Sequence, residues 1–252
     1  MNYPHRPLVT ALVLLCTTTA TAQPAAGPGK TTGTAAAPAL QPYTARYQVG
    51  YKALSGGQIE ATLRRGSGPG RWIYETQAFP NVIGRIAVSP KAREHSTMEL
   101  TADGMRPLSY EFNDGSADVD QDVRLSFDWS ALKVSGRADG KDFTLDIEPG
   151  TQDTASVQAA MIAALAAGRA PSGFPIVTGS KLREYRYWSE GKEMVSTPLG
   201  RYETVIWASQ RNGSNRIAKV WHAPALGYLP VQAIQFRKGK QLVQMKLVAL
   251  ER

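Results

Sequence analysis

Short alternating segments separated by turn residues dominate the chain after residue 42. In residues 43–51, Tyr43, Ala45, Tyr47 and Val49 alternate with other, mostly polar, side chains, which is typical of a strand with one buried face. Glycine, aspartate and asparagine stand between such segments, as tight turns require. Further segments of this kind are residues 58–65, 71–79, 93–101, 106–112, 120–128, 131–137, 141–147, 181–189, 192–196, 201–210, 215–222, 229–237 and 241–250.

One segment departs from this alternating pattern. Residues 151–168 are rich in alanine, methionine and leucine, and apolar residues including Met161 and Leu165 recur at helical spacing. Asp153 or Thr154 can cap the start of this helix. Hairpins join antiparallel neighbours directly, so we predict a mainly β fold. It is an antiparallel, barrel-like or curved-sheet domain of about a dozen strands with one central helix.

The first 22 residues have the order of an export signal. Arg6 precedes an apolar run over residues 8–16, and small residues lead to Ala22. We expect cleavage after Ala22 and a periplasmic location. The apolar run is too short to cross a bilayer as a helix, which needs about 20 residues. In the alternative, Cys16 is lipid-anchored; that processing favours a small residue before the cysteine, whereas Leu15 stands there.

Composition divides the rest of the chain into two parts. Residues 23–40 consist mainly of alanine, threonine, glycine and proline, and they predict a disordered tether. Residues 41–252 predict a single β-rich domain. The only cysteine lies within the predicted signal, so the mature chain has no disulfide and its stability depends on an ordinary hydrophobic core.

Charge is unevenly distributed along a chain of net charge +8. Residues 102–153 hold five Lys or Arg against twelve Asp or Glu, whereas residues 181–252 hold thirteen against five. The basic half can attract anionic envelope components such as lipid phosphates. Scattered solvated charge is the alternative explanation. Export argues against a nucleic-acid partner, and the mature chain has no predicted transmembrane segment.

Two motifs in the C-terminal half resemble a known family. Residues 197–205 read TPLGRYETV, and residues 220–231 read VWHAPALGYLPV. Together with the opening strand and the central helix, they resemble the Domain of Unknown Function 3108 family of exported bacterial proteins over about residues 41–250. The predicted helix departs from the family's bulkier pattern because it is rich in alanine. The resemblance implies a β-rich periplasmic fold and supplies no catalytic residues.

Residues suited to catalysis are few. Only His95 and His222 remain after signal cleavage, too few for a multi-histidine metal site, and no cysteine nucleophile remains. The sequence Glu94-His95-Ser96 cannot converge on a strand, where neighbouring side chains point to opposite faces. We therefore predict no catalytic residues, no metal site and no cofactor, and a hydrolase is the less favoured alternative.

An acidic run forms the last candidate site. Asp118, Asp120 and Asp122 share one face if the segment is a strand, and like charges there repel without a cation. A calcium loop of the EF-hand type needs glycine at its sixth position and glutamate at its twelfth, where Val123 and Trp129 stand. We expect a solvated acidic loop.

Three function classes remain. We favour a non-enzymatic binding module for a lipid or another apolar envelope ligand, because small barrels commonly enclose such cavities. Its predicted contacts are the aromatic residues Trp221, Tyr228 and Tyr47, with Met161 and Leu165 as lid contacts. A structural or assembly partner of other envelope proteins is the alternative, and it predicts a filled barrel with a large exposed apolar patch.

Overall fold

The computed structural model describes residues 40–52 and 54–252. The predicted signal and all of the predicted tether except Leu40 lie outside the described residues. Fifteen strands form one sheet in the order β8-β7-β6-β5-β4-β3-β2-β1-β15-β14-β13-β12-β11-β10-β9. The first eight are β1 (Tyr43–Tyr51), β2 (Leu54–Arg65), β3 (Arg71–Pro80), β4 (Arg93–Thr101), β5 (Gly104–Asn113), β6 (Val123–Asp128), β7 (Lys133–Ala138) and β8 (Lys141–Asp146).

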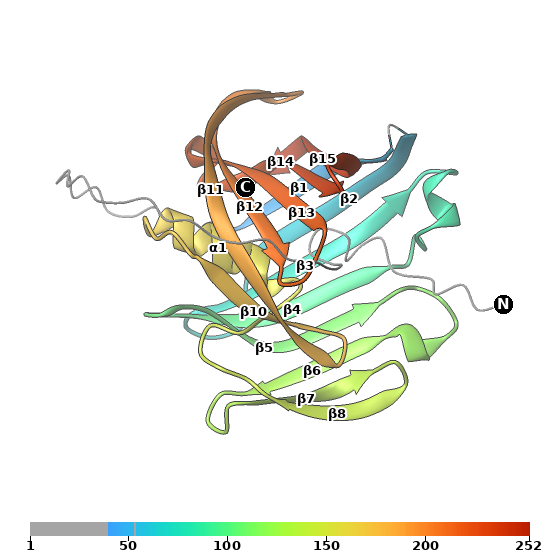
Figure 1. Ribbon diagram of the computed structural model, residues 1–252, viewed down its shortest axis with the longest axis vertical. Helices are drawn as coiled ribbons and strands as arrows, with labels where there is room; N and C mark the ends of the chain where they lie inside the picture. Colours follow the sequence, from blue (N-terminus) through green and yellow to red (C-terminus); the bar gives the residue numbers. More distant parts are fainter. Residues whose placement is uncertain (1–39, 53) are drawn as a thin grey trace.

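The second half of the chain continues the same sheet. Its strands are β9 (Gln152–Asp153), β10 (Gly173–Thr178), β11 (Lys181–Thr197), β12 (Gly200–Arg211), β13 (Arg216–Ala223), β14 (Leu229–Arg237) and β15 (Lys240–Glu251). Neighbouring strands in the sheet pair antiparallel, except that β9 and β10 are parallel across α1 (Ser156–Ala166). Antiparallel pairing of β1 with β15 joins the two halves. The sheet ends at β8 and β9 without closing, and it curls around α1 (Figure 1).

The predicted curved-sheet fold with one helix is confirmed, with more strands than the predicted dozen. Residues 181–189 and 192–196 form the single strand β11, whose register shifts between Ser189 and Gly191. Strands β9 and β10 were not predicted. Strand β6 starts at Val123 rather than at residue 120, because Val119–Gln121 form the 3-10 turn η3 within an exposed acidic loop.

Helix α1 is buried on almost all sides. Ten of its eleven residues are buried, and it packs against β5, β4 and β9. A helix that is apolar all round belongs in an interior. The N-cap residue is Ala155 rather than the predicted Asp153 or Thr154, but the Asp153 carboxylate accepts hydrogen bonds from the backbone N–H groups of Ala155 (2.8 Å) and Ser156 (2.6 Å) at the start of the helix.

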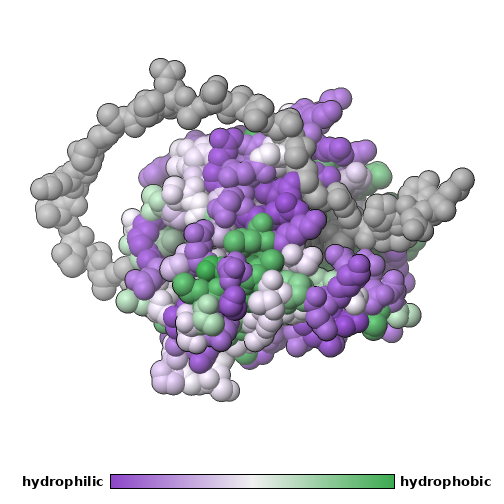
Figure 2. All heavy atoms as spheres, turned by 60° about the horizontal axis from the view of Figure 1, so that its bottom comes forward, coloured by the Kyte–Doolittle hydropathy of each residue, from purple (hydrophilic) through white to green (hydrophobic). Residues whose placement is uncertain are grey.

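The inner face of the sheet carries the main core. Ala45 and Leu63 are fully buried there, as is Leu247 on β15, and Tyr47 is almost fully buried. The face with β6–β8 turned forward is largely hydrophilic, with hydrophobic residues gathered in its middle (Figure 2). Within residues 40–52 and 54–252 there is no helix with the length and hydrophobicity needed to cross a membrane.

Candidate apolar binding site

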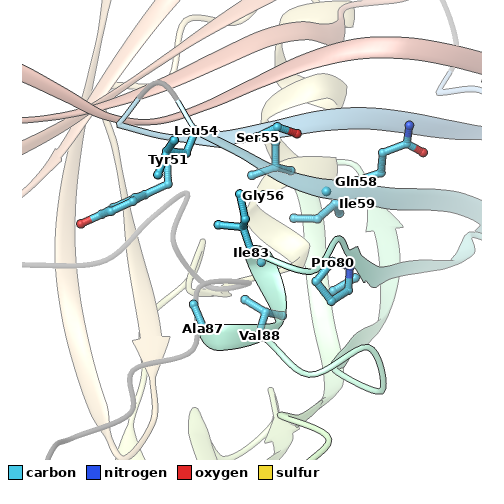
Figure 3. Close-up of a pocket in the computed structure, with 14 residues that line it drawn as sticks. Tyr51, Leu54, Ser55, Gly56, Gln58, Ile59, Pro80, Ile83, Ala87 and Val88 are labelled. Atoms are coloured by element: carbon cyan, nitrogen blue, oxygen red, sulfur yellow. The ribbon is translucent and has the colours of Figure 1, made fainter.

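An apolar pocket lies where β1 and β3 end and β2 begins. Its volume is about 320 Å³. Val49 of β1 and Ile59 of β2 line it. Pro80 at the end of β3 and Ile83 and Val88 of the β3–β4 connection line it as well (Figure 3). The surface of the pocket is therefore almost entirely hydrocarbon and backbone, which suits an apolar ligand.

The pocket lies at one end of the inner face of the sheet. Side chains alternate along a strand, so Val49 lies on the same face as Ala45 and Tyr47, and Ile59 lies on the same face as the buried Ala61. Helix α1 occupies the other end: Arg169, just after the helix, donates to the Asp103 carbonyl in the β4–β5 turn. The α1 end holds a smaller pocket of about 190 Å³ beside Ile162 and Tyr43, and the larger apolar pocket lies at the β1–β2 end.

Asn81 holds the β3–β4 connection over the pocket. Its side-chain amide donates to the Ser55 carbonyl (2.9 Å), and its backbone N–H donates to the Gly56 carbonyl (3.1 Å). Its side-chain oxygen accepts from the Gly84 N–H (2.9 Å) at the start of the 3-10 turn η2 (Gly84–Ile86). A Cβ atom at Gly84 would stand 1.9 Å from the Gly56 carbonyl oxygen, so the close approach requires glycine.

Four aliphatic side chains surround the pocket and face solvent. We call them the apolar rim: Val82 (85% exposed), Ile86 (84%), Leu54 (56%) and Ile83 (51%). Scattered exposed apolar residues are ordinary, but a group of them beside an apolar pocket marks an interaction site. The sequence pattern of residues 81–90 does not distinguish a strand from a loop. The signal that could have located this site was three aliphatic side chains in a five-residue turn, VIGRI.

Substituting Gly84→Ala is expected to detach the β3–β4 connection from β2, because the new methyl group meets backbone. We expect a loss of about 1–3 kcal/mol in the free energy of unfolding, with faster amide hydrogen exchange over residues 81–92. Gly56→Ala is the matched control, since its Cβ would meet its nearest neighbour at 3.7 Å, an ordinary contact. Equal exchange in the two variants would contradict this account of the connection.

A buried polar cluster stands between the pocket and the helix. Glu94 Oε1 accepts from the Tyr110 hydroxyl (2.8 Å) and lies 2.6 Å from the Thr154 hydroxyl. Beside them, the Ser96 hydroxyl donates to Asp153 (2.7 Å). These bonds tie the start of α1 to β4 and β5. The described residues hold no group of three or more His, Cys, Asp or Glu that could bind a metal ion.

Burial dominates the electrostatics of this cluster. It raises the pKa of Glu94, although hydrogen bonds from Thr154, Tyr110 and Thr76 oppose the shift. It also raises the pKa of Asp153 from 3.8 to about 7, against the hydrogen bonds from the Ser156 amide, Ser96 and the Ala155 amide. Desolvation disfavours the charged carboxylate in both cases.

The stability of the fold should therefore depend on pH through Asp153. Because the folded-state pKa is raised, this carboxyl contributes stability fully below about pH 4 and loses that contribution as pH rises through 7. Relative to Asp153→Asn, the wild type should lose about 1–4 kcal/mol between those limits. Urea unfolding across pH measures the difference. The exposed Asp142→Asn is the control, and a parallel pH profile for wild type and Asp153→Asn would contradict the prediction.

His95 lies on the outer face, in a polar groove of about 500 Å³ between β2 and β5. Its Nδ1 lies 2.9 Å from Glu75 and its Nε2 3.2 Å from the Thr97 hydroxyl. Burial acts to raise the pKa of Glu75, but hydrogen bonds from Arg64 and His95 outweigh it and lower the pKa. A carboxylate, an imidazole and a hydroxyl in this order resemble a hydrolase triad. Thr97, however, is not among the residues that line the groove, so the hydroxyl and the hollow do not coincide.

The sequence Glu94-His95-Ser96 and the buried His222 do not form catalytic sites either. Glu94 and Ser96 are buried on the inner face while His95 faces outward, so these three neighbours do not converge, as predicted. His222 is buried, and its Nδ1 lies 2.9 Å from the Tyr228 carbonyl oxygen, to which it donates. Burial lowers the pKa of His222 to about 4, against that hydrogen bond.

The predicted ligand contacts lie in the filled part of the interior. Trp221 and Tyr47 belong to the main core, where the Trp221 indole donates to Glu193 (2.7 Å) and the Tyr47 hydroxyl donates to the Pro230 carbonyl (3.0 Å). Met161 and Leu165 pack against Trp207. The half-buried Tyr228 packs against both groups. None of the five predicted contacts lines the pocket described above.

Trp221→Ala separates a core role from ligand contact. Truncating a buried tryptophan is expected to lower the free energy of unfolding by about 3–5 kcal/mol. The partly exposed Trp188 is the matched control and should cost much less. Ligand retention unchanged beside a collapsed Tm would make Trp221 a core residue, whereas lost ligand with an unchanged Tm would make it a contact.

Comparisons with known proteins give a family and no activity. A family model described as "Protein of unknown function (DUF3108)" matches residues 42–247. No functionally curated protein matches the chain. Two similar solved structures are a predicted exported protein with a YmcC-like fold from Bacteroides fragilis (10% identity, TM-score 0.33, 85% of this chain and 98% of that one) and a predicted lipoprotein from Parabacteroides distasonis (9%, 0.34, 84% and 96%).

Proposed function

This chain belongs to the DUF3108 family of proteins of unknown function, and we propose that it is a non-enzymatic binding protein for the apolar chain of an envelope lipid. The observation that carries the proposal is the apolar pocket between Val49, Ile59 and the β3–β4 connection. We propose that the protein acts in the periplasm after export, as the order of basic, apolar and small residues before Ala22 indicates.

The size and surface of the pocket support a single hydrocarbon chain. About 320 Å³ lies at the lower end of the range of small-molecule sites, which is about 300–1,000 Å³. Charged side chains are absent from its described lining, so a chain inside it would leave no buried ionic group without a partner. A polar headgroup would remain at the open side, near the exposed Tyr51 and Ser55.

The bound chain would run along the inner face of the sheet. From Val49 the next inward residue on β1 is Tyr47, one of the predicted contacts, so the inner end of the ligand would approach its ring. Contact with Trp221, Tyr228, Met161 or Leu165 requires the core around α1 to open, and it stays a prediction.

Docking to another envelope protein is the second candidate, favoured by the apolar rim. It expects burial of Val82 and Ile86 against the partner, two residues that do not line the pocket. The two functions differ in whether they require an open pocket: ligand binding requires it, and docking to a protein does not. Filling the pocket while leaving the rim intact therefore distinguishes them.

Ala87→Trp places a large side chain at the edge of the pocket, where Ala87 is exposed enough for the fold to tolerate it. We expect binding of a fluorescent conjugated fatty acid, measured by titration, to weaken at least about tenfold, which corresponds to about 1.4 kcal/mol. Ala131→Trp in the exposed β6–β7 turn is the matched control and should bind as the wild type does.

Native mass spectrometry of the protein purified from its own cells supplies the second measurement. A co-purifying lipid that is lost from Ala87→Trp and retained by Ala131→Trp supports the proposal. If the wild type carries no apolar mass and does not bind the fatty acid, the binding module is wrong and docking becomes the better explanation.

A further inference from the structure

Three segments at the end of the sheet that carries the apolar rim are positively charged and hold no acidic residue. They are residues 50–57 of the β1–β2 hairpin, residues 79–91 of the β3–β4 connection, and residues 236–242 of the β14–β15 hairpin. Their basic residues, which we call the basic set, are Lys52, Arg85, Lys91, Arg237, Lys238 and Lys240, all of them exposed.

These segments form one continuous surface. The Lys52 N–H donates to the Leu242 carbonyl (2.9 Å), which joins the β1–β2 turn to the start of β15. The Asn81 N–H donates to the Gly56 carbonyl (3.1 Å), which joins the same hairpin to the β3–β4 connection. The β1–β2 turn and the β3–β4 connection lie at the same end of the sheet (Figure 1). The apolar rim therefore stands between two groups of basic side chains.

The charges of the basic set have no acidic partners among the described residues, although the Lys52 ammonium lies over the Tyr51 ring. None of the six takes part in an ion pair there, whereas basic residues elsewhere, such as Arg46, Lys133 and Lys192, pair with acidic neighbours. The acidic loop with Asp118 and Asp120 follows β5 at the same end of the sheet, and it touches the β3–β4 connection where the Ser89 hydroxyl donates to the Gly115 carbonyl (3.1 Å) close to Lys91. This end of the sheet is thus polarised: the acidic loop lies beyond β4 and β5, and Lys52, Arg237, Lys238 and Lys240 lie on the opposite side of the rim.

We propose that the apolar rim and the basic set together dock onto an anionic lipid surface. Val82 and Ile86 enter the boundary between headgroups and acyl chains, and the basic set contacts the lipid phosphates around them. Exposed aliphatic side chains surrounded by Lys and Arg are the composition of interfacial membrane-binding segments. The apolar rim alone fits a protein or a lipid surface, and the basic residues beside it favour an anionic lipid surface. This surface goes beyond the proposed function and requires no ligand in the pocket.

Vesicle sedimentation of the purified protein tests the proposal. We expect binding to vesicles of phosphatidylcholine mixed with phosphatidylglycerol, weaker binding to phosphatidylcholine alone, and a decrease with salt. The double substitution Val82→Asp and Ile86→Asp should weaken binding at least about tenfold. Lys238→Glu with Lys240→Glu should weaken it by a similar factor and flatten the salt dependence. Val119→Asp is the control, because Val119 is equally aliphatic and 70% exposed but lies in the acidic loop.

Other outcomes would overturn the proposal. Binding that the rim variant and Val119→Asp change equally would show that the rim has no special role. Equal binding to neutral and anionic vesicles would remove the role of the basic set. A dimer in sedimentation equilibrium that Val82→Asp dissociates, without vesicle binding by the wild type, would make the rim an interface between copies of the chain.

The variant Ala87→Trp keeps this test separate from the proposed function. It fills the pocket and leaves the rim and the basic set in place, so it should lose the fatty acid and still bind anionic vesicles. The rim variant should show the opposite pattern when the fatty acid is supplied in solution. Failure of one proposal can therefore be told apart from failure of the other.

Discussion

Pairing of β1 with β15 is the constraint on which the rest of the structure depends. Strands β1–β8 and β10–β15 are each built mainly from neighbouring hairpins, which need only local contacts. The β1–β15 ladder joins residues almost a whole chain apart and makes one continuous inner face from two half-sheets. The pocket borders this junction, because Val49 and Tyr51 pair with Met245 and Val243 on β15. A movement of one half-sheet relative to the other would therefore change the shape of the pocket.

The helix explains why the larger apolar pocket lies at the β1–β2 end of the interior. An apolar helix can fill the space that a single curved sheet leaves open, but α1 has only eleven residues and cannot extend along the whole interior. Hydrogen bonds fix its N-terminus: Asp153 accepts from Ser96, and Glu94 accepts from Tyr110 and Thr154. The carboxyl groups of Asp153 and Glu94 are therefore buried beside the helix. Beyond them the inner face continues without a covering helix, and the β3–β4 connection forms the wall of the pocket instead.

The sequence predicted what depends on local patterns and missed what depends on distant pairing. Alternation in residues 43–51 and the helical spacing of Met161 and Leu165 are local, and both elements are present. Strand β9 has two residues and exists only through pairing with β10, so no period could reveal it. Residue type predicts Trp221 and Tyr47 as ligand contacts; both are buried in the core, and their contact with a ligand stays a prediction. The pocket was missed because residues 81–90 follow no regular period.

Specific interactions of the β3–β4 connection keep the apolar rim exposed. A flexible turn could fold Val82 and Ile86 back onto the sheet and remove them from water, which would be favourable by about 1.5–3 kcal/mol for each side chain. The hydrogen bonds of Asn81 and the close contact between Gly84 and Gly56 hold the turn in a conformation that prevents this. Local interactions therefore maintain a surface that is unfavourable in water alone. Such a surface becomes favourable when a second apolar phase covers it, and the basic residues around it indicate that this phase carries negative charge.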